Sequence, residues 1–346
     1  MLSRISSSDS ELAKKLGQIE HRYLSAQLTP DESAKPALVQ HVGEAFILPT
    51  LKGYMSDISY MGSTYEFTAL PGKSDFDIQF FIKLPITREY GRKVFGSEVE
   101  SSGNAAWKFV KGGPANLLDD AGYLSTYKAL NVIKSTIDRA LTGNPRLTFQ
   151  GGPVEITRST SGPAVTLNVK WRGERVSIDI VVCLKAADLG NSEFDLVAKP
   201  YVKSTMAPIS RYWRLSYSSH ELELLRKFHY NHPRKNTLLR IMKLVKQHHS
   251  QLGLFPSYFY KNILFLMVEE NPSADWDRQS DLAARFKDMV VLIQRVLQSR
   301  NLPLHFNRKV NYLEDMESTR IEVVANFLKR IVSQGKYIEL LNVIET

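Results

Sequence analysis

The stretch that decides the fold is Gly62-Ser63-Thr64-Tyr65-Glu66, followed by Asp75-Phe76-Asp77-Ile78 and, much later in the chain, Val176-Ser177-Ile178-Asp179-Ile180-Val181. Asp75 and Asp77 are two residues apart in a predicted strand, so their side chains leave the same face of it. Asp179 stands in a second, apolar strand, where an aspartate is costly unless it is paired or binds a metal. The small residues Gly62 and Ser63 would let backbone N–H groups approach a triphosphate closely.

Together these residues predict a metal-dependent nucleotidyl-transfer site. Two hard cations held by carboxylate oxygens can clamp the attacking hydroxyl and the leaving pyrophosphate of an in-line displacement. We therefore expect Asp75, Asp77 and Asp179 to be catalytic and to bind two Mg²⁺ or Mn²⁺ ions. The alternative is that Asp75 and Asp77 lie on a solvated edge strand and that Asp179 is a paired core carboxylate.

The composition is that of an ordinary globular protein. The chain has 346 residues, 43% hydrophobic and 23% charged, which is enough for two domains with substantial cores. The N-terminus has no apolar h-region, and no apolar run approaches the roughly 20 residues that span a bilayer, so we expect a cytoplasmic protein without membrane contact. The single cysteine, Cys183, follows Asp179 in the same strand, which favours a buried, inert thiol.

The net charge of +9 predicts attraction to a polyanion, either nucleic acid or an anionic membrane surface. A predicted N-terminal helix carries Lys14, Gln18 and Arg22 on one stripe, opposite an apolar stripe that includes Leu12 and Leu16. Such a polar stripe is usually just solvated, which is the alternative here. The candidate nucleic-acid contacts are Lys14, Arg22, Arg234, Lys235, Arg240 and Lys246.

Hydrophobic periodicity predicts an α+β protein with two lobes. Helix is expected from about 11 to 56, interrupted at Thr29-Pro30-Asp31, with Asp31 as N-cap, and bent near Pro49. The expected strands are 76–84, 153–159, 164–171 and 175–184, with a helix at 120–141. Further helices are expected at 221–231, 236–252, 257–270, 280–299 and 315–345. We expect residues 1–205 to form a mixed β-sheet catalytic lobe with an N-terminal helical spine, and residues 206–346 an all-helical lobe that closes the nucleotide pocket.

The chain resembles the cGAS and cGAS-like receptor family of Mab-type nucleotidyltransferases, which make cyclic dinucleotides when they bind double-stranded nucleic acid. The resemblance covers most of the chain and continues past the aspartates. Its further stretches are Trp213-Arg214-Leu215-Ser216-Tyr217-Ser218, Met242-Lys243, Ser257-Tyr258, Asn271-Pro272 and Trp276-Asp277-Arg278. It implies a bilobal nucleotidyltransferase fold and a cyclic GMP-AMP-type product made from ATP and GTP.

The same resemblance implies roles for individual residues. Gly62 and Ser63, with Lys243 and Ser257, would hold the triphosphate. A guanidinium and a phenol ring are flat faces suited to stacking on a purine, which is the implied role of the pair Arg214 and Tyr258; the alternative is a surface charge and a core aromatic. Ser216 and Glu221 are the implied contacts to a base edge, and Lys203 a further nucleotide contact.

Departures from the family pattern bear on the activator. Vertebrate cGAS carries a zinc-binding insertion of one histidine and several cysteines, but this chain has no cysteine near its histidines in that region, so no zinc is expected. Family members without the insertion include insect cGAS-like receptors, several of which respond to double-stranded RNA. The resemblance therefore implies an innate immune sensor of double-stranded RNA, with double-stranded DNA as the less favoured activator. A ligand-induced homodimer stays open.

The base preference and the linkage of the product also stay open, because Val181 stands where cGAS has a threonine that contacts guanine. We expect the loop from Phe67 to Ser74 to respond when a duplex binds along the Lys14/Arg22 helix. Two other functions remain as alternatives. One is a catalytically silent, nucleotide-binding adaptor of the same superfamily, and the other is an RNA-tailing nucleotidyltransferase.

Overall fold

The computed structural model describes residues 7–83, 91–94, 103–109, 115–159, 165–185, 194–199, 209–276, 278–314 and 316–344. The chain divides into two compact units. We call residues 28–66 and 72–222 the sheet unit, and residues 1–27, 67–71 and 223–346 the helical unit. The sequence predicts a single boundary at 205/206, whereas the chain passes between the units four times. The N-terminal helix joins the helical unit because Leu12, Leu16 and Ile19 are buried in that unit's core.

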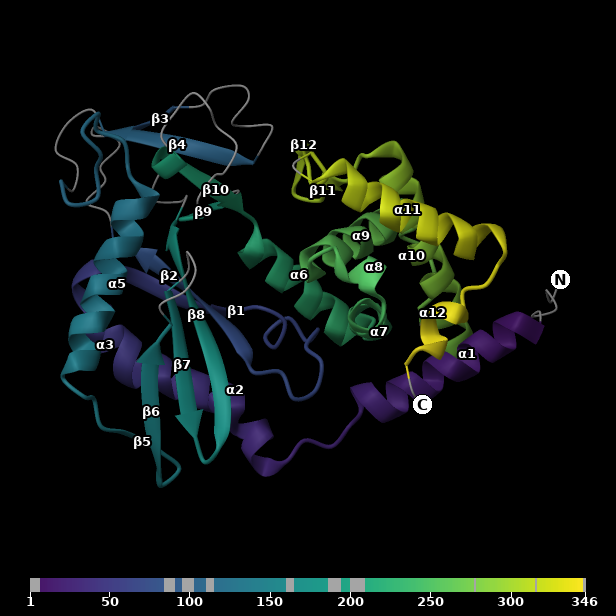
Figure 1. Ribbon diagram of the computed structural model, residues 1–346, viewed down its shortest axis with the longest axis horizontal. Coiled ribbons are helices and arrows are strands. Elements are labelled where there is room, and N and C mark those ends of the chain that lie inside the picture. Colours follow the sequence, from purple (N-terminus) through teal and green to yellow (C-terminus); the bar gives the residue numbers. More distant parts are fainter. Residues whose placement is uncertain are drawn as a thin grey trace. The chain divides into compact units, whose positions relative to one another are not determined.

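Among the described residues of the sheet unit, ten strands form one mixed sheet (Figure 1). They are β1 (Met55–Met61), β2 (Asp75–Ile82), β3 (Gly91–Val94), β4 (Asn104–Phe109), β5 (Leu147–Phe149), β6 (Gly152–Arg158), β7 (Val165–Trp171), β8 (Glu174–Leu184), β9 (Asp195–Val197) and β10 (Tyr212–Ser216). Strand order along the main path is β3-β4-β10-β9-β8-β7-β6-β5, and β2 lies between β1 and β8. The β2–β8 pair is parallel, and the other described pairs are antiparallel. This confirms the expected mixed sheet.

One face of this sheet is the core of the unit. Strands alternate their side chains between faces, so Phe76, Ile78 and Phe80 of β2 and Ile178 and Ile180 of β8 enter the same apolar cluster. Helices α2 (Pro30–Val42), α3 (Leu48–Leu51) and α5 (Thr126–Thr142), with the π-helical turn η2 (Gly43–Ile47), pack on this face. The opposite face of β2 and β8 carries Asp75, Asp77 and Asp179, and we call it the carboxylate face.

Local chemistry corrects the predicted helix at 11–56. The N-cap of α2 is Thr29 and not Asp31, because Thr29 and Glu32 form a reciprocal capping box that satisfies two backbone N–H groups. The helix does not continue to 56, since a π-helical turn and Pro49 at the start of α3 lead into a short 3₁₀ turn, η3 (Lys52–Tyr54), and then into β1. Pro49, where a bend is expected, lies at the start of α3, and the helical run continues past it into η3 before β1 begins.

The helical unit holds α1 (Ser7–Ile19) with the π-helical turn η1 (Glu20–Leu24), most of α6 (Ser218–Asn231), and then α7 (Arg234–His248), α8 (Ser250–Gly253), α9 (Ser257–Glu270), α10 (Gln279–Ser299), α11 (Ser318–Ser333) and α12 (Glu339–Asn342). A hairpin of β11 (Pro303–Leu304) and β12 (Asn307–Asn311) interrupts the helices, which the sequence does not predict. The expected helix 315–345 is split, because Gly335 adopts a left-handed φ of 64° just after α11.

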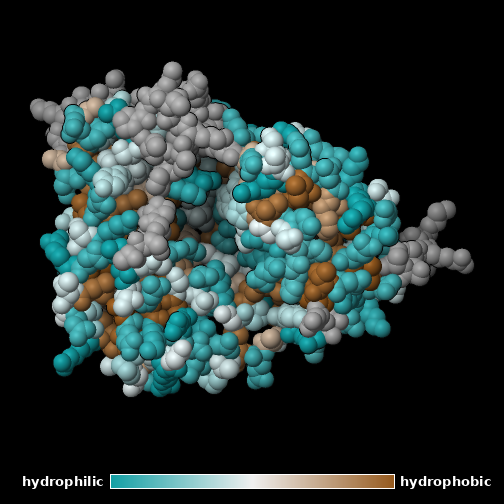
Figure 2. Space-filling model, in the orientation of Figure 1, coloured by the Kyte–Doolittle hydropathy of each residue, from teal (hydrophilic) through white to brown (hydrophobic). Residues whose placement is uncertain are grey.

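The surface shows hydrophobic side chains only as separate patches among hydrophilic ones on the face drawn in Figure 2, as on globular proteins in general. Among the described helices, none combines the length and the apolar composition needed to cross a membrane.

Candidate functional site

The turn after β1 places a glycine against a carboxylate. Met61, the last residue of β1, is the antiparallel partner of Asp77 in β2. Gly62 then adopts a left-handed φ of 85°, and its carbonyl accepts hydrogen bonds from the backbone N–H groups of Tyr65 and Glu66, both at 3.1 Å. The next side chain, Ser63, accepts a hydrogen bond of 2.7 Å from Lys73 Nζ. The predicted phosphate turn is therefore a tight turn beside the second aspartate.

The three predicted carboxylates share the carboxylate face of the sheet. Asp77 and Asp179 are direct partners across the parallel β2–β8 pair. Asp75 is paired with Ser177, two residues earlier on each strand. Asp75 is exposed, whereas Asp77 and Asp179 are half-buried. The hydroxyl of Thr166, the residue opposite Asp179 in β7, donates a hydrogen bond of 2.6 Å to Asp179 Oδ1. Thr166 orients one carboxylate, a contact that the sequence analysis missed.

The donor set fits a hard divalent cation. Mg²⁺ and Mn²⁺ are bound by carboxylate oxygens, and Asp75, Asp77 and Asp179 would supply them. In the part of the chain that the structure describes, no three His, Cys, Asp or Glu side chains converge as a ready-made metal site. Carboxylates repel one another when no cation lies between them.

Two of the predicted base contacts, Arg214 and Ser216, lie on the same face. Arg214 is paired with Val197 of β9, and Val197 with Cys183 of β8; these register positions share a side with Asp179. Ser216 follows Arg214 by two residues and keeps to that side, while Trp213 between them is buried in the core. The register therefore brings Arg214 and Ser216 to the face that carries the aspartates.

Gln79 and Ser218 are connected to Ser216 by hydrogen bonds, and neither was predicted as a site residue. Gln79 donates a hydrogen bond of 2.5 Å from Nε2 to Ser218 Oγ, which lies 2.9 Å from Ser216 Oγ. The available signal was spacing, since Gln79 follows Asp77 by two residues and so leaves the same face of β2. The predicted base contact Glu221 is only 3% exposed, in the first turn of α6.

The remaining predicted nucleotide contacts belong to the helical unit. Lys243 Nζ donates to the carbonyl of Thr68 at 2.7 Å and to its Oγ1 at 3.0 Å. Ser257 is the first residue of α9, and its Oγ accepts from Lys246 Nζ at 3.5 Å. The ring of Tyr258 lies 5.6 Å from that of Tyr312, centroid to centroid. Lys203 and Asp277 lie outside the described residues.

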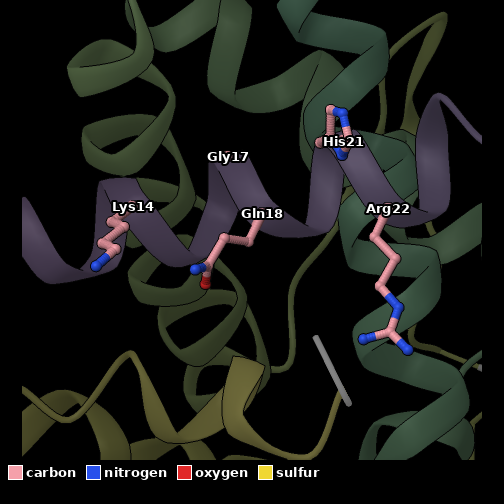
Figure 3. Close-up of a pocket in the computed structure, with 5 residues that line it drawn as sticks. All are labelled: Lys14, Gly17, Gln18, His21 and Arg22. Atoms are coloured by element: carbon pink, nitrogen blue, oxygen red, sulfur yellow. The ribbon is translucent and has the colours of Figure 1, made fainter.

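The basic stripe of the N-terminal helix is exposed. Lys14, Gln18 and Arg22 extend from one side of α1 and η1 (Figure 3), opposite the buried Leu16 and Ile19. With Gly17 and His21 they line an open hollow of about 480 Å³. Lys14 and Arg22 lie eight residues apart along α1 and η1, and both side chains are exposed.

The other predicted nucleic-acid contacts make internal contacts in the helical unit. Arg234 donates to Gln279 Oε1 at 2.7 Å and pairs with Glu20 at 3.4 Å. Lys235 is 8% exposed, its Nζ lies over the Phe228 and Trp276 rings, and burial lowers its pKa. Arg240 and Lys246 are half-buried, and burial lowers the pKa of both side chains.

The buried thiol is confirmed. Cys183 is fully buried, and burial raises the pKa of the thiol well above its usual value. Cys183 lies on β8, four residues beyond Asp179. Because its thiol stays protonated, it adds no charge to the carboxylate face.

Comparison with known proteins agrees with this arrangement. Residues 72–227 match the Mab-21 protein nucleotidyltransferase domain, and residues 234–330 match the Mab-21 protein HhH/H2TH-like domain. A cyclic GMP-AMP synthase-like receptor of Ctenocephalides felis is 24% identical over 310 residues, covering 76% of this chain and 69% of that protein. Cyclic GMP-AMP synthase-like receptor 3 of Stylophora pistillata is 24% identical over 341 residues, covering 94% and 96%.

A third relative, the cyclic GMP-AMP synthase-like receptor of Aethina tumida, is 26% identical over 238 residues. That match covers 63% of this chain and 58% of the relative, so the chain spans less than two thirds of that protein. The matched nucleotidyltransferase domain covers most strands of the large sheet, and the matched HhH/H2TH-like domain covers α7 to α10 and most of α11. The chain belongs to the Mab-21 family, with a nucleotidyltransferase domain followed by a HhH/H2TH-like domain.

Proposed function

We propose that this nucleotidyltransferase joins ATP and GTP into a cyclic dinucleotide of the GMP-AMP type, and that double-stranded RNA activates it as an innate immune sensor. The observation that carries the proposal is the pairing of Asp77 with Asp179 across β2 and β8, beside the Gly62 turn. The relatives, which are cyclic GMP-AMP synthase-like receptors, support the choice of product class.

Each residue has a stated task in this proposal. Two bound Mg²⁺ or Mn²⁺ ions would supply charge neutralisation at the phosphates and activation of the attacking hydroxyl. Asp75, Asp77 and Asp179 bind these ions, and Thr166 holds Asp179 in place. Backbone N–H groups of the Gly62–Ser63 turn bind the triphosphate.

Other side chains bind the nucleobases and the remaining phosphates. Arg214 stacks on a base from the carboxylate face, and Ser216 and Glu221 contact a base edge. Lys243, Ser257 and Tyr258 are the proposed contacts of the helical unit. Because a ring needs two phosphodiester bonds, the linear dinucleotide formed first has to bind again with its own triphosphate as donor.

Activation is proposed to begin at the basic stripe. Lys14 and Arg22 are exposed on α1 and η1, and phosphate contacts of this kind are sequence-independent and salt-dependent. The segment 67–71, which separates the phosphate turn from β2, belongs to the helical unit. Arg240 links the two, because it donates to the carbonyl of Leu24 at 2.8 Å and to that of Ala69 at 2.9 Å.

One experiment tests the function. The purified chain is incubated with all four nucleoside triphosphates and Mg²⁺ or Mn²⁺, with double-stranded RNA, double-stranded DNA or neither, beside an Asp77→Asn control. Mass spectrometry after phosphatase treatment identifies the products. A cyclic dinucleotide that appears only with RNA, and not with Asp77→Asn, is expected and would identify the bases.

Other outcomes would replace parts of the proposal. The same product with DNA alone keeps the synthase and changes the activator. Nucleotide binding without any product favours a silent adaptor. Extension of an RNA primer favours a tailing enzyme.

A further inference from the structure

Lys73 lies directly before the strand that carries the first two aspartates. The carbonyl of Ser74 accepts a hydrogen bond of 2.7 Å from the backbone N–H of Ser177, so contact between the two central strands begins one residue before Asp75. Gly72, with a left-handed φ of 71°, turns the chain into β2. This turn holds Lys73 in a fixed place, two residues before Asp75.

The side chain of Lys73 contacts the phosphate turn, Gly62–Ser63. Its Nζ donates a hydrogen bond of 2.7 Å to Ser63 Oγ, and both residues are half-buried. Among the described residues, no carboxylate is paired with the Lys73 ammonium, although three aspartates lie on the same sheet. The cation is thus directed to a neutral hydroxyl of the phosphate turn and not to a neighbouring anion.

A hydrogen bond to a neutral hydroxyl satisfies this cation only in part. An ammonium group has three hydrogens to donate, and a half-buried charge costs free energy unless an anion compensates it. The Ser63 hydroxyl supplies no charge. A phosphate group at the turn would supply one, because an ammonium is a compact point charge that suits phosphate oxygens. The contact therefore points to an anion that binds beside Ser63.

The lysine that was expected to hold the triphosphate has partners elsewhere. Lys243 Nζ donates to the carbonyl and to Oγ1 of Thr68, and both residues belong to the helical unit. Lys73 and Ser63 both belong to the sheet unit, as do the three aspartates. Lys73 is therefore a cation that the sheet unit itself supplies at the phosphate turn.

We infer that Lys73 binds the phosphates of the donor nucleotide beyond its α-phosphate, and that it gives the site a preference for a triphosphate over a monophosphate. One hydrogen of the ammonium can stay on Ser63 Oγ while the other two bind phosphate oxygens. The inference rests on the proposed nucleotidyl-transfer function. It adds a positive side chain to a phosphate site for which the proposal names only backbone N–H groups in the sheet unit.

The test separates the phosphates from the base. The α,β-methylene analogue of ATP keeps three phosphates but cannot release pyrophosphate, and AMP has the same base and sugar with one phosphate. Calorimetry with Mg²⁺ measures the affinity for the analogue, and the same titration in the presence of AMP measures the affinity for AMP even where AMP binds weakly. The variants are Lys73→Met and the control Lys83→Met. Lys83 is exposed and directly follows the other end of β2, so the control removes the same charge.

Lys73→Met should lower the affinity for the analogue by about tenfold or more, as the loss of one hydrogen bond between charged groups does, and the affinity for AMP by less than about twofold. Lys83→Met should keep both parent affinities. A Ser63→Ala background shows whether Lys73 acts directly. There, Lys73→Met should still weaken binding of the analogue, because the ammonium itself contacts phosphate.

Three results overturn the inference alone. They are an unchanged affinity for the analogue in folded Lys73→Met, equal losses for the analogue and AMP, and the same loss in Lys83→Met. An effect of Lys73→Met that vanishes in the Ser63→Ala background also overturns it, because Lys73 would then act only by holding Ser63. If Lys73→Met does not fold, Lys73→Gln, which also removes the charge, takes its place. If the folded parent does not bind the analogue, the proposed function itself fails, and the inference fails with it.

Discussion

Gly62 and Asp77 are packed so closely that a methyl group on Gly62 would lie 2.2 Å from Oδ2 of Asp77. Contact at that distance is not tolerated by real side chains, so one of the two groups would have to move. Gly62 also has a φ of 85°, a conformation that favours glycine. The turn that is proposed to bind phosphate and the carboxylate that is proposed to bind metal are thus placed by one glycine.

Gly62→Ala should therefore reduce nucleotidyl transfer strongly. The strained backbone costs about 1–2 kcal/mol, and displacement of the Asp77 carboxylate should lower the rate by about 100-fold, as small misplacements of reacting groups do. Gly53→Ala is the matched control, because a methyl group there meets nothing within 4 Å. Steady-state rates and thermal unfolding of both variants check this. A fully active Gly62→Ala would contradict the geometry.

Thr166→Val should weaken metal-dependent activity without unfolding the protein. Valine keeps the shape of threonine but removes the hydroxyl that donates to Asp179 Oδ1. A hydrogen bond to a charged group is worth about 1.5–3 kcal/mol, so we expect the Mg²⁺ concentration for half-maximal rate to rise by about tenfold. Thr157→Val, an exposed threonine on the neighbouring β6, is the control. Equal metal dependence in both variants would rule out an orienting role for Thr166.

Lys14→Ala combined with Arg22→Ala should weaken binding of double-stranded RNA. Each phosphate contact that is lost removes about 0.9 from the slope of log affinity against log salt on B-DNA, and a similar amount is expected on RNA. The paired control is Arg320→Ala with Lys329→Ala, two exposed cations of α11 that remove the same charge. Fluorescence anisotropy across a salt series measures both pairs. Identical slopes for both pairs would exclude the basic stripe as the RNA surface.

Arg240→Met should loosen the segment 67–71. The substitution leaves the carbonyls of Leu24 and Ala69 without this donor, at a cost of about 1–3 kcal/mol. Hydrogen exchange of segment 67–71 should become faster, and RNA should still bind but stimulate activity less. Lys227→Met, an exposed cation on α6, serves as the control. Slow exchange and full stimulation in Arg240→Met would disprove the link.

Asp119 should make folding stability depend on pH in the acid range. Burial raises the pKa of Asp119, but hydrogen bonds from Arg211 and from the backbone N–H groups of Tyr123 and Ala121 outweigh it and lower the pKa. A lowered folded pKa gives stability that is present above the unfolded value of about 4 and is lost as the pH falls through the folded value. Denaturant unfolding from pH 7 to pH 2 should show a smaller acid loss in Asp119→Asn than in the parent. Arg211, the partner of Asp119, directly precedes β10, the strand that carries Arg214.

The hydrophobic pattern was sufficient for the elements with strong periodicity. Alternation in Asp75–Ile82 and Glu174–Leu184 predicted both central strands and the face of their aspartates, because side-chain direction in a strand depends only on position. The apolar stripe of Leu12, Leu16 and Ile19 likewise predicted which side of the first helix is buried. Two further strands were missed. Met55–Met61 begins where helix was expected up to residue 56, and Tyr212–Ser216 is a strand of five residues that pairs with β4, a segment far away in the chain.

The sequence by itself determined the chemistry of this protein: three aspartates at strand spacing, a glycine turn before them and an excess of positive charge. Only the tertiary structure decided which residues act together. It paired Asp77 with Asp179, brought Thr166 to one carboxylate and Gln79 to Ser218, and turned Arg234, Lys235 and Arg240 toward partners inside the helical unit. The physical reason is that local pattern fixes the direction of a side chain along its own element, whereas hydrogen-bond partners and burial depend on contacts between segments far apart in the chain.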